Sequence, residues 1–267
     1  MGEGSVTRVF ITGASSGLGE ALARHYAKDG TVLGLVARRK AELEKLLAEL
    51  PAPSGKSHRV YVLDVTDHAA LGEAARDFLA HAGGIDIVIA NAGVSRGTLT
   101  EYAEDLPVIA RIMAINVVAM AATFSPFIAA MKEQARYGQA CRLVGIASVA
   151  GIRGLPGAEA YSASKAAVIN YCESLRVELR AADIKVVTIA PGYVDTPMTR
   201  VNPYPMPFLM LPDEFAARAA AAIAKGKSYA VIPWQMGMVA KLLRMLPNWL
   251  YDWAFAKAPH KPRDLTE

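Results

Sequence analysis

A tyrosine and a lysine one helical turn apart are the clearest chemical feature of this sequence. Lys165 lies four positions after Tyr161, within a stretch whose pattern predicts a helix from 159 to 182. Residues with this spacing lie on the same helix face. A nearby ammonium stabilises a phenolate, so we expect Lys165 to lower the pKa of Tyr161 from about 10 towards the working pH. Tyr161 would then act as general acid and base for a carbonyl/alcohol pair, although a surface pair has the same spacing.

Two further polar residues stand where a strand ends and where a helix is buried. Ser148 directly follows the apolar run 142–147, which predicts a strand. Sites in α/β proteins form at the carboxyl ends of parallel strands, so the Ser148 hydroxyl would hold the substrate oxygen beside Tyr161. Asn116 lies inside the uncharged stretch 112–131, and a buried amide is costly unless it is hydrogen-bonded. A local packing bond explains Asn116 as well as a catalytic role does.

A glycine-rich turn connects the first predicted strand to the first predicted helix. The turn has the sequence Thr-Gly-Ala-Ser-Ser-Gly-Leu-Gly from Thr12 to Gly19, with glycines at positions 13, 17 and 19. Glycines allow a tight turn and a close approach of backbone to ligand, and the helix N-terminus offers free N–H groups to a pyrophosphate. An ordinary strand-to-helix turn has similar glycines, but this position favours nucleotide binding.

The end of the second predicted strand carries two arginines. Ala37 stands where NAD-specific sites commonly place an acidic residue for the ribose, and Arg38 and Arg39 follow it. A guanidinium pairs with a 2′-phosphate, so the pattern favours NADP(H) over NAD(H), with Arg38 as the first choice for that contact. Two solvated residues at a helix start remain the alternative interpretation.

These residues need a scaffold, and alternating apolar runs and helical patterns supply one. The predicted strands are 6–12, 31–37, 59–63, 85–90, 142–147, 185–190 and 228–232. The main predicted helices are 17–28, 38–50, 67–82, 107–132 and 159–182. This alternation predicts an α/β fold with a parallel sheet and helices on both faces. We find no linker or repeat, so we expect one domain over 1–267 with its core at about 6–232.

Composition excludes several classes of protein. The chain has 267 residues, 20% charged and 53% hydrophobic, which excludes an intrinsically disordered protein. Two cysteines are too few for a disulfide-rich scaffold or a cysteine-only zinc site. The five histidines show neither a His-x3-His spacing nor a pairing with cysteine, and we expect no metal site.

The net charge of +4 comes from the C-terminal part of the chain. From Lys225 onward there are seven basic and three acidic residues, whereas the first 224 residues are neutral. No nucleic-acid-binding module accompanies this charge, so we expect no nucleic-acid partner. The first residues lack the basic and apolar regions of a signal peptide, and we expect a cytoplasmic location.

Taken together, the motifs resemble those of the short-chain dehydrogenase/reductase (SDR) family. The matching elements occur in family order over about residues 6–200: Thr12–Gly19, Asp64-Val65, Asn91-Ala-Gly93, Asn116, Ser148, Tyr161-x3-Lys165 and Pro191–Thr196. One departure is Ala90, where many members have a second asparagine. The resemblance implies a single-domain, Rossmann-type, doubly wound parallel sheet of about seven strands.

The resemblance also implies roles for individual residues. Tyr161 would transfer the proton, Lys165 would lower its pKa and bind the nicotinamide ribose, Ser148 would position the carbonyl, and Asn116 would hold a water near Lys165. The implied cofactor-binding set is Gly13, Ser15, Ser16, Gly17, Leu18, Gly19, Arg38, Arg39, Asp64, Val65, Asn91, Ala92, Gly93, Tyr161, Lys165, Pro191, Gly192, Val194 and Thr196. Members usually form dimers or tetramers through the helices predicted at 107–132 and 159–182.

Substrate information is expected after the sixth predicted strand, in an apolar, proline-rich flap at 193–211. Methionines adapt to varied apolar shapes, so we expect a lipophilic substrate, although the flap's apolar residues also suit packing on the sheet or a partner subunit. The loop after Ser148 would form the opposite wall of the substrate site. Because this loop contains Arg153, an anionic substrate remains an alternative. The candidate substrate residues are Ser148, Arg153, Leu155, Tyr193, Met198, Met206 and Phe208.

The segment 234–256 has helical apolar spacing and three tryptophans, and basic residues follow it. This pattern predicts an amphipathic C-terminal arm, split at Pro247, that packs on its own or a neighbouring subunit. An interfacial membrane helix has the same signature, so a peripheral membrane contact is the competing interpretation.

The sequence therefore predicts an NADP(H)-dependent oxidoreductase that interconverts a carbonyl and a secondary alcohol, on an apolar substrate such as a lipid, a steroid-like molecule or an acyl ketone. A non-catalytic NADP(H)-binding sensor or scaffold on the same fold is the alternative. The set Asn116, Ser148, Tyr161 and Lys165 argues for the enzyme.

Overall fold

Seven short apolar runs form a parallel sheet in the computed structural model, which describes residues 6–53 and 56–263. The strands are β1 Arg8–Thr12, β2 Val32–Ala37, β3 Arg59–Val62, β4 Ile87–Ala90, β5 Arg142–Ile146, β6 Lys185–Pro191 and β7 Tyr229–Ile232. All neighbouring strands pair in parallel. The central strands are buried on both faces, which explains their continuous apolar sequences. The signal-peptide expectation concerns the first residues, most of which lie outside the described range.

The strand order β3-β2-β1-β4-β5-β6-β7 reverses direction between β1 and β4. Val9 of β1 pairs with both Val32 of β2 and Ile87 of β4, so β1 stands at the centre of the reversal. Ligands of open α/β sheets bind outside the carboxyl ends of the strands at such a point. The predicted doubly wound fold is confirmed.

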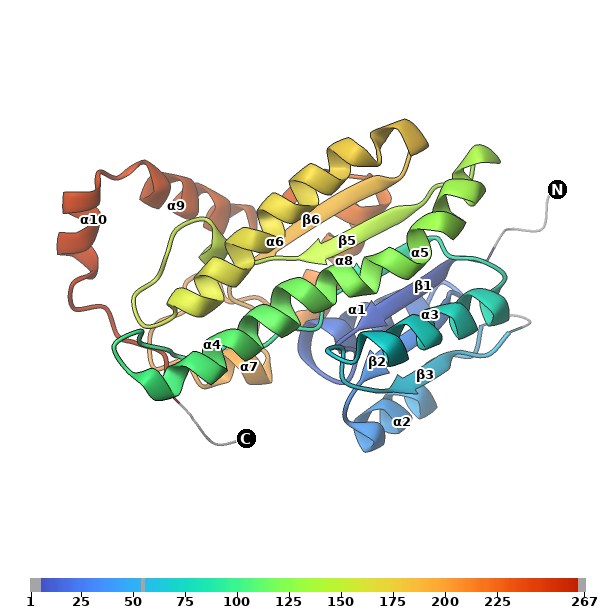
Figure 1. Ribbon diagram of the computed structural model, residues 1–267, viewed down its shortest axis with the longest axis horizontal. Helices are drawn as coiled ribbons and strands as arrows, with labels where there is room; N and C mark the ends of the chain where they lie inside the picture. The colour runs from blue at the N-terminus through green and yellow to red at the C-terminus, as the bar shows by residue number, and fades with distance from the viewer. Residues whose placement is uncertain (1–5, 54–55, 264–267) are drawn as a thin grey trace.

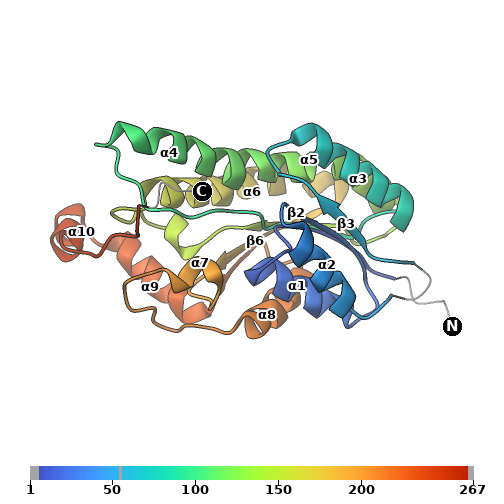
Figure 2. The same ribbon diagram turned by 90° about the horizontal axis from the view of Figure 1, so that it is seen from below.

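Helices cover both faces of the sheet (Figures 1 and 2). One layer holds α3 His68–Ala82, α4 Leu106–Met113, α5 Ala119–Arg136 and α6 Glu159–Glu178. The other holds α1 Gly17–Ala27, α2 Lys40–Glu49 and α8 Pro212–Ala224. Each layer has its own core: Phe78, Phe124 and Phe127 are fully buried on the first side, and Phe215 is fully buried on the second.

The long helix predicted at 107–132 is confirmed, and it contains one irregular turn. A π-helical segment at Ala114–Val118 lies between α4 and α5 without interrupting the helix. This segment carries Asn116, which is only 2% exposed. π-segments occur mostly as single turns within helices and frequently at functional sites. By length and composition the whole stretch Ala103–Arg136 would be long and apolar enough to span a membrane, but Phe124 and Phe127 of α5 pack in the core beside the sheet.

The C-terminal arm consists of two helices, α9 Trp234–Met245 and α10 Asn248–Phe255, separated at Pro247 as predicted. The arm projects beyond one end of the sheet (Figure 1). After α10 the chain turns back towards the body, where Gly97 donates a backbone hydrogen bond of 3.1 Å to the carbonyl of Pro262. The short helix α7 Pro197–Arg200 lies in the flap.

Candidate active site

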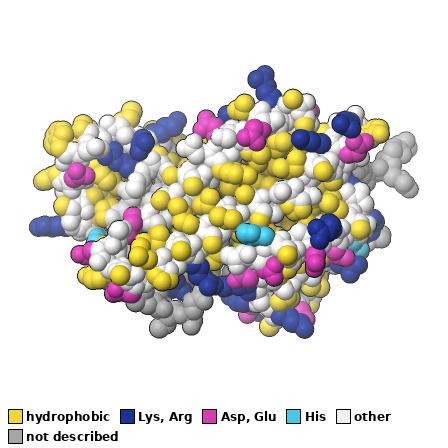
Figure 3. Space-filling view, viewed as in Figure 1, with side chains coloured by type: hydrophobic (Ala, Val, Ile, Leu, Met, Phe, Trp, Pro, Cys, Tyr) yellow, Lys and Arg dark blue, Asp and Glu magenta, His cyan; other side chains and the backbone are white. Residues whose placement is uncertain are grey.

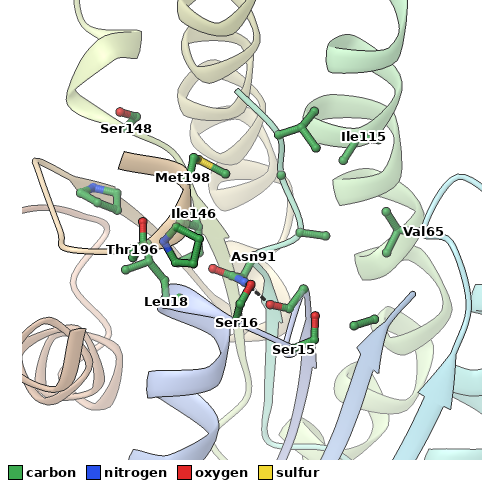
Figure 4. Close-up of a pocket in the computed structure, with 18 of the residues that line it drawn as sticks. Ser15, Ser16, Leu18, Val65, Asn91, Ile115, Ile146, Ser148, Thr196 and Met198 are labelled. Carbon is green, nitrogen blue, oxygen red and sulfur yellow. Dashed lines mark hydrogen bonds between the residues drawn. The ribbon is translucent and has the colours of Figure 1, made fainter. Parts of the chain in front are cut away.

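A cavity of about 420 Å³ lies at the carboxyl ends of β1 and β4, where the strand order reverses. Figure 4 shows Ser15, Ser16 and Asn91 towards one end and Ser148 and Met198 towards the other. The main lining residues are Gly13, Ser15–Leu18, Ala37–Arg39, Leu63–Val65, Asn91–Val94, Ile115, Ile146–Ser148, Tyr161, Lys165, Pro191, Gly192, Val194 and Thr196–Thr199. The cavity therefore joins the glycine turn to the predicted catalytic residues.

The glycine turn is built for close backbone approach. Gly13 has a φ of +69°, which is left-handed and favours glycine. Gly19 serves packing instead, because a Cβ there would lie 2.2 Å from the Gly13 carbonyl oxygen. Asn91 fixes the same turn from β4 by donating to the carbonyls of Thr12 at 3.0 Å and Gly13 at 3.2 Å. The N-terminus of α1 is thus held open towards the cavity, in the arrangement that binds a pyrophosphate.

Every predicted cofactor residue lines this cavity except Gly19, which packs behind it. The first and last residues of the set, Gly13 and Thr196, are 183 positions apart in sequence. Gly17 shows how closely the two ends of the set meet, because a Cβ there would lie 3.3 Å from the Thr196 methyl carbon. The residues present therefore fit a nicotinamide dinucleotide along the carboxyl edge of the sheet.

Both arginines after β2 lie at the glycine-turn end of the cavity. Arg39 donates to the hydroxyl of Ser16 at 2.6 Å and to that of Ser15 at 3.0 Å. The Arg38 guanidinium lies 3.6 Å from the Asp64 carboxylate. Burial acts to raise the pKa of Asp64, but hydrogen bonds from Thr66 and the charge of Arg38 lower it overall. The sequence favoured Arg38 for a 2′-phosphate, whereas the structure brings both guanidinium groups to this end.

Ser148, Tyr161 and Lys165 line the same cavity at the other end. Burial raises the pKa of Tyr161, and hydrogen bonding to Ser148 opposes the shift. The predicted lowering by Lys165 is therefore wrong in direction here, since desolvation of the phenolate is the larger effect. A raised pKa keeps the Tyr161 hydroxyl protonated but also makes it a weaker acid.

Lys165 is buried next to the tyrosine that it was predicted to assist. Its Nζ lies 5.8 Å from the centre of the Tyr161 ring and donates to the carbonyl of Ile146 at 2.8 Å. Burial lowers the pKa of Lys165 to about 8. The ammonium is thus held at the end of β5, two residues before Ser148, rather than directed only at the phenol oxygen.

Asn116 does not line the cavity but supports the residues that do. Its Oδ1 accepts from the Val94 N–H at 2.8 Å, and its Nδ2 donates to the Val94 carbonyl and to the Ser164 hydroxyl at 2.9 Å. Ser164 in turn donates to the Tyr161 carbonyl at 2.7 Å. Asn116 therefore makes the local packing bonds that its sequence position suggested. Through Ser164 these bonds connect the π-segment to the helix that carries Tyr161.

The candidate substrate residues fall into two groups. Ser148 and Met198 line the cavity. Outside the lining set are Arg153, Leu155, Tyr193, Met206 and Phe208. Phe208 is 50% exposed, and the ring of Tyr193 lies edge-on to that of Tyr204 at 6.4 Å. Arg153 points instead at the C-terminal arm, where it donates to the carbonyl of Leu246 at 2.8 Å.

Sequence reasoning missed the contribution of the C-terminal tail. The Lys261 ammonium is 8% exposed and donates to the Ser95 hydroxyl at 2.9 Å and to the Met198 carbonyl at 3.4 Å. Burial lowers the pKa of Lys261 to about 8. Two residues later, Arg263 makes two hydrogen bonds to the fully buried Asp105 carboxylate, at 2.8 and 3.0 Å. No local pattern marks these contacts, because each joins residues more than 60 positions apart.

Comparison with known proteins agrees with this geometry. A family model of short chain dehydrogenases matches residues 7–204. An uncharacterized oxidoreductase of Myxococcus xanthus (strain DK1622) is 40% identical over 254 residues, which cover 94% of this chain and 97% of that protein. The 11-beta-hydroxysteroid dehydrogenase-like 2 protein of Arabidopsis thaliana is 33% identical over 269 residues, covering 96% of this chain and 84% of that one.

A solved structure shows the same architecture. A short chain dehydrogenase/reductase from Burkholderia phymatum, in complex with NAD, superposes with a TM-score of 0.79 at 25% identity. The match covers 99% of this chain and 100% of that one. The fold and the nicotinamide cofactor class are therefore common to this chain and its relatives.

We predict that Gly19→Ala weakens dinucleotide binding by about tenfold to a hundredfold, because overpacking costs about 1–3 kcal/mol and each 1.4 kcal/mol is tenfold. The new methyl group would meet the Gly13 carbonyl, which is backbone and cannot rotate away. NADPH titration by fluorescence measures the effect. Gly72→Ala in α3 is the control, since the nearest atom to its Cβ is the Arg76 side chain at 3.5 Å. Equal binding by Gly19→Ala and wild type would contradict the packing role.

Proposed function

The chain belongs to the short-chain dehydrogenase/reductase family, whose members are oxidoreductases acting on CH–OH groups, and we propose that it is an NADP(H)-dependent enzyme that interconverts a carbonyl and a secondary alcohol on an apolar substrate. The observation that carries this proposal is the placement of Ser148, Tyr161 and Lys165 in the cavity that begins at the glycine turn. A sensor or scaffold would need the turn but not these three side chains.

The protein's own chemistry in this reaction is proton transfer and orientation. A bound nicotinamide supplies or accepts the hydride at the carbonyl carbon. In the direction of reduction, Ser148 holds the carbonyl oxygen by its hydroxyl, and Tyr161 donates its proton to that oxygen. The raised pKa of Tyr161 keeps it protonated before the step but also makes it a weaker acid, so proton donation needs a charge that stabilises the phenolate. Lys165, bonded to the Ile146 carbonyl, places a positive charge beside the phenol that becomes a phenolate.

The preference for NADP(H) is argued from charge at the glycine-turn end of the cavity. Ala37 offers no carboxylate to a ribose 2′-hydroxyl, and it is followed by Arg38 and Arg39. Arg39 already bridges the end of β2 to Ser15 and Ser16 of the turn, so its guanidinium is held at the turn although the residue is exposed. Two cations at this place suit a 2′-phosphate better than a free hydroxyl.

We expect the double substitution Arg38→Ala, Arg39→Ala to raise the KM for NADPH by about tenfold to a hundredfold, since a hydrogen bond to a charged group contributes about 1.5–3 kcal/mol. The KM for NADH should change by less than about threefold, because no 2′-phosphate is lost. Steady-state kinetics with both cofactors measures this. Arg136→Ala, at an exposed position of α5 that pairs with Glu133, is the matched control. An equal loss with NADH and NADPH would contradict the assignment.

The apolar substrate is argued from the flap and the walls near Ser148. Val94, Ile146, Val194 and Met198 line the cavity close to the catalytic residues. Several flap side chains remain open to solvent: Met198 at 39%, Val201 at 56%, Phe208 at 50%, Leu209 at 48% and Leu211 at 65%. Burial raises the pKa of the flap residue Tyr204 to about 12, with smaller contributions from Tyr193 and Tyr161. The name of the Arabidopsis relative, a hydroxysteroid dehydrogenase-like protein, agrees with this substrate class.

We predict that NADPH consumption by the wild-type protein rises with chain length and ring count across a series of ketones. Tyr161→Phe should lower turnover by about 10²–10⁴-fold, the usual contribution of general acid–base catalysis, while NADPH binding stays within about threefold. Tyr171→Phe, on the same helix but 38% exposed, should leave turnover unchanged. NADPH binding by the wild type without turnover of any carbonyl would favour the sensor alternative. Turnover confined to small polar carbonyls would contradict the apolar substrate.

The proposal includes assembly into a homodimer or homotetramer, in the cytoplasm, through the α4–α6 layer. Figure 3 shows hydrophobic side chains gathered over this layer, and those exposed include Met113, Val118, Tyr171 and Val177. Exposed apolar patches of this kind mark interaction sites. We therefore expect light scattering to give twice or four times the 28.5 kDa chain mass. A monomer at micromolar concentrations would contradict this part of the proposal.

A further inference from the structure

The C-terminal arm presents a row of large apolar side chains to solvent. The exposed fractions are 63% for Trp234, 55% for Met238, 58% for Leu242, 72% for Met245, 71% for Trp249 and 78% for Trp253. Successive members are three or four residues apart, which is the repeat of one helix face. At about 100° per residue, the four members on α9 fall within about 80° of one another. We call this set the arm stripe.

The opposite face of the arm is buried, so the stripe cannot turn inward. Met236, Gly237 and Ala240 are the buried positions of α9. A Cβ at Gly237 would lie 3.1 Å from Val231 of β7, and one at Gly192 would lie 2.7 Å from the Met236 side chain. The helix therefore rests directly on the last strand and on the cavity wall.

The second helix is fixed by Arg153 from the loop after Ser148. Arg153 donates to the carbonyls of Leu243 and Leu246 and, at 3.2 Å, to the Asn248 side chain. Its guanidinium also lies 3.9 Å from the centre of the Tyr251 ring, whose hydroxyl donates to the Gly154 carbonyl at 2.5 Å. A basic side chain at the last carbonyls of α9 stabilises the helix end. Trp249 and Trp253 thus project from a rigid element.

The charge around the stripe is predominantly positive. Between residues 225 and 257 there are five basic residues and one acidic residue, whereas residues 1–224 are neutral. Lys241, Arg244 and Lys257 are exposed on or just beyond the two helices. Lys241 lies at the edge of the stripe, within about 20° of Trp234 on the helix circumference. Apolar residues with tryptophan, bordered by lysine and arginine, form the signature of a helix that lies in a membrane interface.

A second copy of the chain fits this face less well. Interface cores are depleted in charge, and a twofold contact would bring the same basic residues of both copies together. The exposed apolar face of the α4–α6 layer is the better surface for assembly. An anionic lipid surface complements both properties of the arm at once, since its headgroups attract the basic residues and its acyl boundary accepts the stripe.

We infer that the α9–α10 face docks on an anionic lipid surface, with the arm stripe inserted at the headgroup boundary and Lys241, Arg244 and Lys257 against the headgroups. This inference does not depend on the substrate class proposed above, but it would place the cavity close to a lipid phase. The inward side of α9 reaches the cavity wall at Gly192, and the tail beyond α10 reaches Met198.

The three tryptophans of the chain are Trp234, Trp249 and Trp253, and all lie in the stripe, so intrinsic fluorescence reports on this face alone. The full-length protein is titrated with vesicles of phosphatidylcholine containing 30% phosphatidylserine and with pure phosphatidylcholine vesicles. We expect a blue shift, quenching by lipids brominated near the headgroup, and flotation with the anionic vesicles that weakens in high salt.

The double variant Trp249→Ser, Trp253→Ser should bind anionic vesicles at least about tenfold more weakly. Tyr137→Ser, at a position of α5's C-terminal end that is 79% exposed, is the matched control and should bind as the wild type does. Lys241→Gln with Lys257→Gln should reduce binding to anionic vesicles, whereas Lys45→Gln on α2 should not. Both tryptophans are on the surface, so the variant should keep wild-type NADPH consumption with a water-soluble ketone.

If neither vesicle type changes the fluorescence or carries the protein in flotation, the inference is wrong, and the proposed reductase activity is unaffected. Equal binding to neutral and anionic vesicles would overturn the role given to the basic residues. If the tryptophan variant lowers the mass measured by light scattering and the wild type does not bind vesicles, the face is an interface between copies, and the inference is wrong.

Discussion

The site depends on the direct contact between the first turn of α1 and the loop before it. Gly19 leaves no space for a methyl group against the Gly13 carbonyl, so the helix starts as close to β1 as a backbone allows. Asn91, which follows β4, donates hydrogen bonds to the carbonyls of Thr12 and Gly13 in the same loop. One contact therefore aligns the two halves of the doubly wound sheet and opens the N-terminus of α1 to the cavity. The arginines of β2 and the catalytic residues of β5 and α6 take their places relative to that edge.

The reacting end is organised by burial rather than by a simple charge pair. Lys165 and Tyr161 are both desolvated, which lowers the pKa of the lysine and raises that of the tyrosine. Their positions are set by hydrogen bonds to the backbone. Lys165 donates to the Ile146 carbonyl, and Ser164, which accepts a hydrogen bond from Asn116, donates to the Tyr161 carbonyl. The same helices carry the apolar surface proposed for assembly. Subunit contact and the placement of the catalytic residues would thus share a scaffold.

Local patterns in the sequence sufficed for the sheet, the glycine turn and the Tyr161–Lys165 pair, because strand runs and helical spacing express burial directly. They did not suffice for the π-segment at Asn116, where a regular periodicity continues through an irregular backbone. The direction of the Tyr161 shift was also missed, since spacing shows a neighbouring charge but not the desolvation that outweighs it. The contacts of Arg153 and Lys261 could not be predicted from the sequence for another reason. Their partners lie more than 60 residues away in sequence, and only the folded chain brings them together.

Those two distant contacts connect features that the sequence presents separately. Arg153 lies five residues after Ser148 and bonds to the last carbonyls of α9, so the loop that follows Ser148 also fixes the arm. Beyond the arm, Lys261 bonds to Ser95 and to Met198 of the flap, and Arg263 secures the tail on Asp105. The arm and the tail that follows it are therefore attached to the body at two points, the loop after Ser148 and the flap. If the arm rests on lipid, both of these segments are bonded to the docked part of the chain, close to the phase in which an apolar substrate dissolves.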